Sequence, residues 1–373
     1  MLFIDAATVR EILPMSEVIR TQEEVFRGLL NRDSVYRGRI DIYVPNDNPD
    51  EYYRWGTMEG ASRTLGVHAI RLKSDVISWP KDEQGNWTTE EKYSVEPGTY
   101  CGLVFLLSTR NGEPLALINE GHLQHMRVAA GAGIGVKYLA RENSEVVGLY
   151  GSGGMASDFL RAAVCERPIR KVKVYSPTPA NREAFAAEMR RELEIEIEVL
   201  DNPRDVTRGV DIVSACTHTL VPFLEAGWLE PGQHLTTLGG NNWEADVDDR
   251  VDMIMTNGEG GMVPKDEELQ LFEVGRGHSP GAYIVGSDEE IKRLPPPRAT
   301  RPAGRKSRVW TFLDLISGKT PGRTSDTDIT LHRAGGLQGL QFTAAGYAAY
   351  TRAKELGVGR EIPTEWFLQD VRD

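Results

Sequence analysis

Apolar positions in the first 120 residues follow first a helical and then a strand spacing. Residues 14–31 carry apolar side chains at the spacing of one helix face, which predicts an amphipathic helix. Alternating or apolar runs predict strands at residues 39–44, 68–73, 102–108 and 114–119. Asn-Gly-Glu-Pro at 111–114 is a turn sequence, so the last two strands should form a hairpin. The polar stretch 78–98 is predicted as a loop, and the whole segment as an α+β unit with a mostly antiparallel sheet.

Apolar positions beyond residue 126 form short strands separated by helical segments. The predicted strands lie at 146–150, 172–176, 194–200, 211–217, 234–239 and 252–257. Helices are predicted at 122–140, from 155, at 179–192 and at 336–357. Short apolar strands that alternate with helices are typical of a parallel sheet covered on both faces. The expected fold class is therefore α/β, a Rossmann-type doubly wound parallel sheet plus the α+β unit.

Length and charge narrow the possible partners. The chain has 373 residues, more than one hydrophobic core usually serves, which favours two domains. Its 55 Asp and Glu outnumber 43 Lys and Arg, giving a net charge of −12. Such a surface repels phosphate backbones and anionic lipids, so we expect no nucleic-acid and no membrane partner. The N-terminal segment, with Asp5 and no long apolar core, is unlike a signal peptide and predicts a cytoplasmic protein.

The cysteine content argues against two kinds of stabilisation. Only Cys101, Cys165 and Cys216 occur, and they are widely spaced. An odd, sparse set predicts neither a disulfide framework nor a structural zinc site. We assign no metal ligands from the sequence.

A glycine-rich turn follows the predicted strand 146–150. The turn reads Gly151-Ser152-Gly153-Gly154-Met155-Ala156, which is the dinucleotide fingerprint GxGxxA between a strand and a helix. The first glycine permits the tight turn, the second lets a pyrophosphate approach the backbone, and the alanine allows close packing of helix and strand. The helix N-terminus offers free N–H groups to phosphate. We predict a bound dinucleotide; the alternative is a purely structural turn.

The end of the next strand bears on the choice between NAD and NADP. An NAD site usually has an acidic residue there for the ribose 2′-OH, whereas this strand ends in Tyr175-Ser176-Pro177-Thr178. Ser176 and Thr178 are expected to bind a 2′-phosphate, and Arg182 to add charge; alternatively Arg182 is a solvated helix residue. We predict NADP or NAD, with a slight preference for NADP.

The motifs together resemble the ornithine cyclodeaminase/mu-crystallin family of NAD(P)-dependent enzymes. They are, in the family's order, the lysine strand 70–76, the helix start 126–133, the turn 151–156, and the segments 210–217, 228–240 and 322–339. The resemblance implies a substrate-binding and dimerisation domain of residues 1–125 with 320–373, and a Rossmann domain of residues 126–319. It also implies a homodimer whose substrates are amino acids or imines derived from them.

The resemblance implies three cations around the substrate carboxylate, which needs partners when it is buried. Lys73 matches the family's active-site lysine, which hydrogen-bonds the carboxylate and relays a proton. Arg127 matches the arginine at the start of the small-residue helix, beside nicotinamide and substrate. Arg39 matches the clamp arginine of an early strand, with Arg37 as a rival. Read without the resemblance, Lys73 in a strand and Arg127 at a helix start would each be ordinary surface charges.

The resemblance also places the nicotinamide pocket. Thr99 matches a cofactor-contacting threonine, although it is also simply the first residue of a strand. Ligands of open α/β sheets bind at the carboxyl ends of the strands. The pocket edge is accordingly expected from Ala215, Cys216, Thr217, Thr236, Leu238 and Ala334.

Departures from the family bear on the reaction. Ornithine cyclodeaminase has an aspartate after its Gly-Gly, and here Asn241 and Asn242 follow instead. Asn241 is predicted to face the substrate, but an amide cannot accept a proton as a carboxylate does. Trp243 is either a pocket wall or a core residue. His332 is either a proton donor or, as we favour, a hydrogen-bonded core residue.

Imine reduction needs only a carboxylate clamp, a proton source and a nicotinamide. We therefore predict an NAD(P)H-dependent reductase of imines derived from amino acids, or the reverse amino-acid dehydrogenase, with Lys73 and Arg127 as catalytic residues. One alternative is an ornithine- or lysine-type cyclodeaminase in which Asp246 or Asp248 replaces the missing acid. A second is a non-catalytic NADPH-binding protein of the crystallin type.

Overall fold

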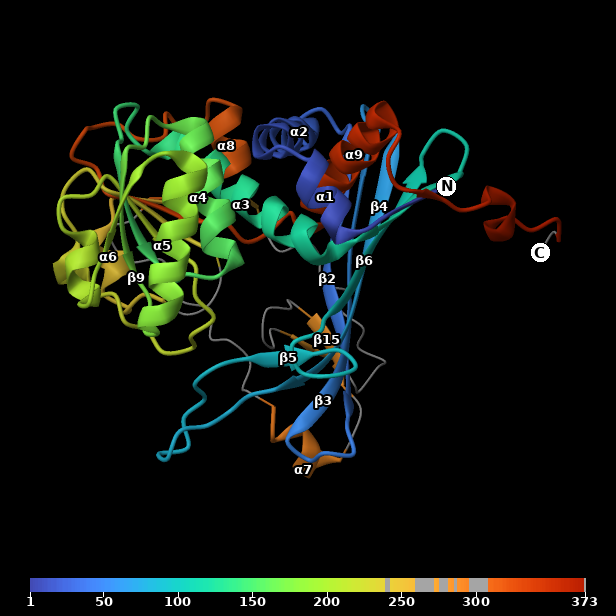
Figure 1. Ribbon diagram of the computed structural model, residues 1–373, viewed down its shortest axis with the longest axis horizontal. Coiled ribbons are helices and arrows are strands. Elements are labelled where there is room, and N and C mark those ends of the chain that lie inside the picture. The colour runs from blue at the N-terminus through green and yellow to red at the C-terminus, as the bar shows by residue number, and fades with distance from the viewer. Residues whose placement is uncertain (239–241, 259–271, 275–280, 285–286, 295–307, 372–373) are drawn as a thin grey trace.

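The computed structural model describes residues 1–238, 242–258, 272–274, 281–284, 287–294 and 308–371. Two sheets with helices between and around them make up this part of the chain (Figure 1). Their arrangement confirms the predicted α/β fold class. Asn241, predicted to face the substrate, lies outside the described residues.

The first sheet is mixed, in the strand order β14-β15-β2-β3-β4-β6-β7-β1-β18, with β5 paired to β4. Its strands are β1 (Leu2–Ile4), β2 (Ser34–Pro45), β3 (Glu51–Ser62), β4 (Val67–Ser78), β5 (Glu91–Tyr93), β6 (Cys101–Ser108), β7 (Pro114–Asn119), β14 (Phe272–Val274), β15 (Gly281–Ile284) and β18 (Arg360–Glu361). The central strands β2 to β7 pair antiparallel, and β6 and β7 form the predicted hairpin.

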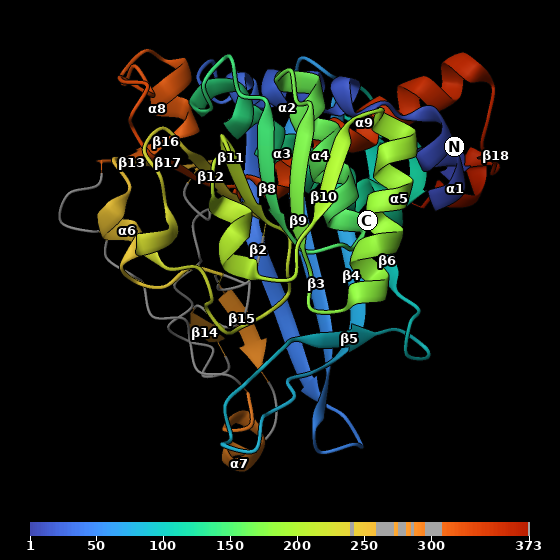
Figure 2. The same ribbon diagram turned by 60° about the vertical axis from the view of Figure 1, so that its left-hand side comes forward.

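The second sheet is parallel throughout, in the order β10-β9-β8-β11-β12-β17-β13-β16 (Figure 2). Its strands are β8 (Val146–Tyr150), β9 (Lys171–Tyr175), β10 (Glu196–Val199), β11 (Ile212–Ala215), β12 (His234–Thr237), β13 (Met253–Thr256), β16 (Arg308–Thr311) and β17 (Thr330–Arg333). The inner strands are apolar and buried on both faces, as a covered parallel sheet requires.

Helices cover both sheets. They are α1 (Ala6–Ile12), α2 (Met15–Gly28), α3 (Glu120–Leu139), α4 (Gly154–Glu166), α5 (Pro179–Leu193), α6 (Val247–Arg250), α7 (Asp288–Ile291), α8 (Phe312–Ile316) and α9 (Gln338–Leu356), with 3-10 turns η1 (Pro203–Thr207), η2 (Ala226–Trp228) and η3 (Thr364–Phe367). Among the described residues, no helix is both long and apolar enough to cross a bilayer.

Helix α3 joins the two sheets. It contacts α2 and α9 above the first sheet, and α4, β12 and β17 of the parallel-sheet unit. Small residues allow this close packing: a methyl group on Gly133 would lie 3.1 Å from side-chain atoms of Ile19 and Ala162. The first turns of α3 therefore contact both units: Glu120 accepts hydrogen bonds from Arg71 of β4, and the His125 ring lies beside Gly154 of α4.

Sheet pairing differs from the sequence expectations in three places. The stretch 78–98, predicted as a loop, contains β5, which pairs with β4 at Val76–Ser78 because β6 covers β4 only from Val67 to Ser74. Strand β17 lies in the parallel sheet although it follows residue 320. Strands β14 and β15 extend the first sheet although they precede residue 319.

Candidate active site

The glycine turn between β8 and α4 has the geometry of a phosphate-binding loop. Gly151 has φ +107°, and a Cβ there would collide with the Cys216 carbonyl oxygen, so only glycine fits. Gly153 precedes the first residue of α4, which has no side-chain cap, and the space around its Cα is open. Exposed N–H groups at the N-terminus of a 13-residue helix suit an anion. Ser152, Gly154 and Met155 complete a turn into which a pyrophosphate fits.

The end of β9 lies beside this turn and carries no carboxylate. Ser176 is buried and Thr178 is exposed. Arg182 is also buried, where it donates to the Ser176 carbonyl oxygen at 2.9 Å and forms an ion pair with Asp201. Arg182 is therefore a buried residue whose charge is paired with Asp201, and the alternative of a solvated helix residue is wrong.

The other predicted cofactor residues lie at the carboxyl ends of β11, β12 and β17. Ala215 ends β11, and Leu238 follows β12 and donates its N–H to the Ala215 carbonyl oxygen at 3.3 Å. Thr217 donates to Asn242 Oδ1 at 2.5 Å. Burial raises the pKa of Cys216 to about 12, so its thiol is a neutral wall residue and no nucleophile. Thr236 and Ala334 are buried close by in the sheet.

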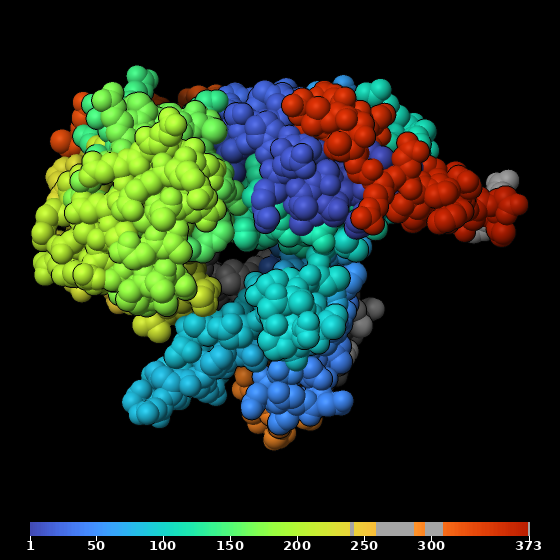
Figure 3. Space-filling view, viewed as in Figure 1, coloured from blue at the N-terminus to red at the C-terminus, as the bar shows by residue number. Residues whose placement is uncertain are grey.

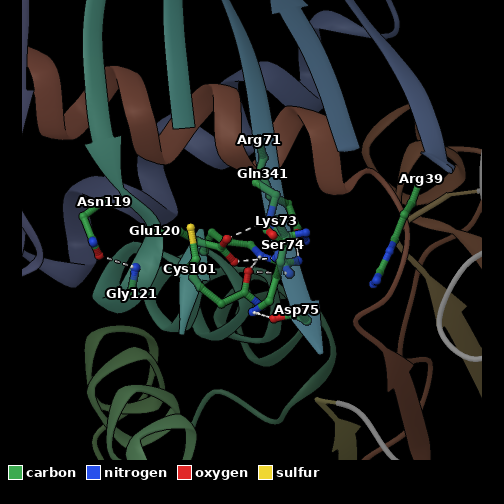
Figure 4. Close-up of polar contacts among 12 residues, drawn as sticks. Arg39, Arg71, Lys73, Ser74, Asp75, Cys101, Asn119, Glu120, Gly121 and Gln341 are labelled. Carbon is green, nitrogen blue, oxygen red and sulfur yellow. Dashed lines mark hydrogen bonds and ion pairs between the residues drawn. The ribbon is translucent and has the colours of Figure 1, made fainter. Parts of the chain in front are cut away.

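A group of charged residues, called the charged face below, lies where β4 of the first sheet passes the start of α3. Figure 4 shows Arg71, Lys73, Asp75 and Glu120 gathered there, with Arg39 to one side. Lys73 on β4 pairs with Gly56 on β3 and Gly102 on β6. A Cβ on Gly56 would collide with Asp41, and one on Gly102 would collide with Glu120. The two glycines therefore let carboxylates lie on either side of Lys73.

Most cations of this charged face are already paired with carboxylates. Arg71 donates to both oxygens of Glu120, at 2.8 and 2.6 Å, and both side chains are buried. Arg54 lies 2.5 Å from Asp75 and 3.5 Å from Glu90. Arg39 lies 2.8 Å from Asp41 with 9% of its side chain exposed, whereas the rival Arg37 is half exposed and pairs with Glu59. These pairs neutralise one another.

Arg127 and Lys73 differ from those cations. Within the described part of the chain, Arg127 donates to Gln341 at 2.6 Å and to Gln124 at 2.9 and 3.1 Å, and to no carboxylate. Burial, with Arg71 nearby, lowers the pKa of Arg127 to about 9. Lys73 Nζ lies 3.5 Å from Asp75, and burial lowers its pKa although Glu120 and Asp75 oppose this. A substrate carboxylate would supply the charge that both lack.

Lys92 is a charged residue near Lys73 that sequence reasoning did not single out. It lies on β5 opposite Ile77, so it shares the sheet face of Lys73 and Asp75. Although Lys92 is exposed, surrounding protein together with Lys73 and Arg54 lowers its pKa to about 8. Its segment is polar throughout and gives no sequence signal. Asp75 was detectable in principle, because strand alternation places it on the same face as Lys73.

The stretch 78–98 also bridges the two sheets. Thr89 forms a β-bridge with Thr219, and Leu220 donates its N–H to the Thr88 carbonyl oxygen at 3.0 Å. Thr219 and Leu220 follow β11, close to the predicted nicotinamide pocket. The space-filling view shows a hollow enclosed by this stretch, the parallel-sheet unit and the first sheet (Figure 3).

Several candidates lie outside this arrangement. Thr99 is exposed and donates to the Ser94 and Glu96 carbonyl oxygens, which closes a turn before β6. Trp243 is a core residue packed in the cluster around Tyr150. His332 is fully buried against Asn257 at 2.8 Å, and burial lowers its pKa to about 3, so it is no proton donor.

The two acids considered as replacements for the family aspartate have other partners. Asp248 is buried and lies 2.6 Å from Arg333. Asp246 accepts a long 3.4 Å hydrogen bond from the Ala226 N–H, on the side of the parallel sheet near η2. Neither carboxylate contacts the charged face in the described structure.

Comparisons with known proteins agree with this architecture. The sequence profile of the ornithine cyclodeaminase/mu-crystallin family matches residues 86–355. The chain is 27% identical to an uncharacterized cyclodeaminase, y4tK, of Sinorhizobium fredii, over 94% of this chain and 95% of that protein. It is 28% identical to a Δ1-pyrroline-2-carboxylate reductase of Bacillus cereus, over 97% and 99%.

Two solved structures have the same fold. The Δ1-pyrroline-2-carboxylate reductase of Thermococcus litoralis, in complex with NADH and L-proline, superposes with a TM-score of 0.73 at 22% identity, covering 97% of this chain and all of that one. An archaeal alanine dehydrogenase dimer with bound NAD superposes with a TM-score of 0.71 at 20% identity, covering 97% and 99%.

Proposed function

Because the chain belongs to the ornithine cyclodeaminase/mu-crystallin family, we propose that it is an NAD(P)H-dependent reductase of imines derived from amino acids, or the reverse amino-acid dehydrogenase. One observation carries the proposal: among the residues that the structure describes, the hydrogen-bond partners of Arg127 are neutral side chains, and the nearest carboxylate oxygen to Lys73 Nζ is 3.5 Å away. Two such cations suit a substrate that brings its own carboxylate. The likeness to Δ1-pyrroline-2-carboxylate reductase supports the same reaction.

The glycine turn would hold the dinucleotide. Gly151, Ser152, Gly153, Gly154 and Met155 fit a pyrophosphate, and Ala215, Cys216, Thr217, Thr236, Leu238 and Ala334 would line the nicotinamide side. When bound, the nicotinamide supplies the hydride that adds to the substrate Cα. Preference for NADP is supported by the missing carboxylate at the end of β9, near Ser176 and Thr178. Arg182 supports it less, because Asp201 already neutralises its charge.

The protein's own groups bind the substrate and move one proton. Arg127 and Lys73 hold the carboxylate, and Arg39 with Asp41 borders the same face. As the hydride reaches Cα, the C=N bond becomes a single bond and its nitrogen takes a proton from Lys73 Nζ. Burial lowers the pKa of Lys73, which makes it a better donor than a solvated lysine. Lysine then regains its proton from solvent; in the reverse reaction it accepts one.

A cyclodeaminase is the second candidate, and the name of the Sinorhizobium relative favours it. Against it, Asn242 stands beside the expected position of the family aspartate, and Asp248 is held by Arg333. A dinucleotide-binding protein without turnover is the third. A protein of that kind does not need a buried and incompletely neutralised cation such as Arg127. Such a charge lowers the stability of the fold, so its presence favours a function that uses it.

The test is the Lys73→Met variant, with exposed Lys354→Met as the matched control. Both are assayed with cyclic and linear imines formed from 2-oxo acids and amines, following cofactor oxidation. We expect Lys73→Met to lose about 10²- to 10⁴-fold in kcat while dinucleotide affinity stays unchanged. Full turnover of the variant would contradict the proposal. Release of ammonia with proline or pipecolate from ornithine or lysine would identify a cyclodeaminase instead.

The proposed assembly is a homodimer formed through residues 1–125 and 320–373. The dinucleotide unit is built by residues 126–319 without β14 and β15, which belong to the first sheet, and it also includes β17. The solved alanine dehydrogenase dimer supports pairing. So does the C-terminal arm, which extends from the body and exposes apolar side chains at Trp366, Phe367, Leu368 and Val371 (Figure 1). Light scattering of the full chain and of a chain ending at residue 362 tests this: only the former should be dimeric.

A further inference from the structure

Two histidines and an aspartate meet where α3 passes α4, beside the glycine turn. His122 and His125 are three residues apart on α3, and Asp158 is on α4. The Nδ1 atom of each histidine lies 3.7 Å from Asp158 Oδ2, and one ligand atom from each residue lies within 4.8 Å of the other two. These separations exceed hydrogen-bond length, so the three groups converge without bonding to one another.

We propose that His122, His125 and Asp158 form a binding site for a divalent transition-metal ion such as Zn²⁺ or Co²⁺. Two imidazoles and a carboxylate are ligands of this class, whereas Mg²⁺ and Ca²⁺ prefer all-oxygen sites. Ligand atoms ~2.0–2.2 Å from one zinc ion lie roughly 3.3–3.6 Å apart in a tetrahedral arrangement, slightly less than the two 3.7 Å separations here, so a small shift would let the three groups share an ion. Water would complete the coordination.

The surrounding residues hold the ligands in place. Asp158 is buried, and its Oδ1 accepts a hydrogen bond from Arg161 at 2.7 Å, which leaves Oδ2 directed at the histidines. Glu192 binds Arg161 at 2.6 and 2.7 Å and offsets its charge. Carboxylates and cations that orient a ligand in this way are typical of the outer shell of metal sites.

The histidine rings are suited to binding a metal. A methyl group on Gly154 would lie 2.8 Å from the His125 ring, so glycine leaves room for the imidazole. The three scattered cysteines predict no metal site, whereas the spacing His-Leu-Gln-His at 122–125 is the signal that the sequence carries for one.

The test is metal binding by the untagged full chain after treatment with a chelator. Equilibrium dialysis with Zn²⁺, and the visible absorption of bound Co²⁺, should give one ion per chain. The His122→Gln/His125→Gln variant should bind at least about 100-fold more weakly. His68→Gln removes a histidine of β4 outside the cluster and should bind as the unmodified chain does.

Equal affinity in the double variant, or absence of binding by the unmodified chain, would overturn the site. Should the double variant misfold, as judged by circular dichroism, NMR of the unmodified chain decides: Co²⁺ must shift the imidazole resonances of two histidines. All of these readouts are independent of turnover, so the metal site and the proposed reductase activity can fail separately.

Discussion

Replacing Arg127 by methionine tests two effects of this buried charge separately: its effect on the stability of the fold and its role in binding a substrate carboxylate. The pKa of Arg127 is lowered from 12.5 to about 9, chiefly by burial. At 1.36 kcal/mol per pKa unit, burying this charge costs on the order of 5 kcal/mol. Methionine removes that cost and keeps the contact with the Phe342 ring, 4.8 Å away. The substitution also leaves the buried Gln341 oxygen without a hydrogen-bond donor, which destabilises the variant by about 1–3 kcal/mol.

We therefore expect Arg127→Met to raise the free energy of unfolding by roughly 2–4 kcal/mol. The matched control is Arg71→Met, on the same face and over the same ring. Arg71 is the bidentate partner of buried Glu120, so its loss leaves an unpaired carboxylate and costs about 3–5 kcal/mol. Two variants of one residue type should thus shift stability in opposite directions.

Urea denaturation of both variants measures the free energy of unfolding. Steady-state kinetics with the best imine substrate measures kcat/KM, which reports the role of the charge in substrate binding and turnover. Arg127→Met should lose about 30- to 5000-fold in kcat/KM, since truncating one side of a buried charge pair costs 2–5 kcal/mol. Equal destabilisation by the two variants would refute the reasoning about neutral partners. Unchanged kcat/KM in Arg127→Met would refute its role in carboxylate binding.

Three further outcomes are expected. Gly153→Ala should fold normally, because the space around residue 153 is open, but it should weaken dinucleotide binding. Gly151→Ala should weaken binding and also lower the melting temperature, because φ of residue 151 is +107°. Equal melting temperatures of the two variants would contradict this expectation. The reductive kcat/KM should fall as pH rises through the lowered pKa of Lys73, because the protonated amine is the donor, and the reverse reaction should rise; a flat profile would exclude this donor. Asp201→Asn should tighten NADPH binding relative to NADH in fluorescence titrations, because it releases the charge of Arg182; an unchanged ratio would place Arg182 away from the ribose.

Much of the fold was predictable because its signals are local. Helix α2 and strands β6 to β9 lie within a few residues of their predicted ranges, since apolar spacing alone separates a helix from a strand. The glycine turn was equally readable, because the demands on Gly151 and Gly153 come from the backbone of their own strand–turn–helix unit.

Long-range pairing was not predictable in this way. Strand β17 pairs with β12 on one side and with β13 on the other, and β15 pairs with β2 of the other sheet, so both strands find their neighbours in segments that are distant in the sequence. The hydrophobic periodicity of a segment predicts that it is a strand, but it does not predict with which other strand it pairs.

The sequence by itself determined which residue types were available: Lys73, Arg127 and Arg39 as cations, and a turn suited to phosphate. Only the tertiary structure decided which of these charges are already neutralised. Arg39 has Asp41 and Arg182 has Asp201, whereas Arg127 has two amides. The physical reason is that the field at a buried charge depends on groups within a few ångströms in space, and those groups come from segments far apart in the chain.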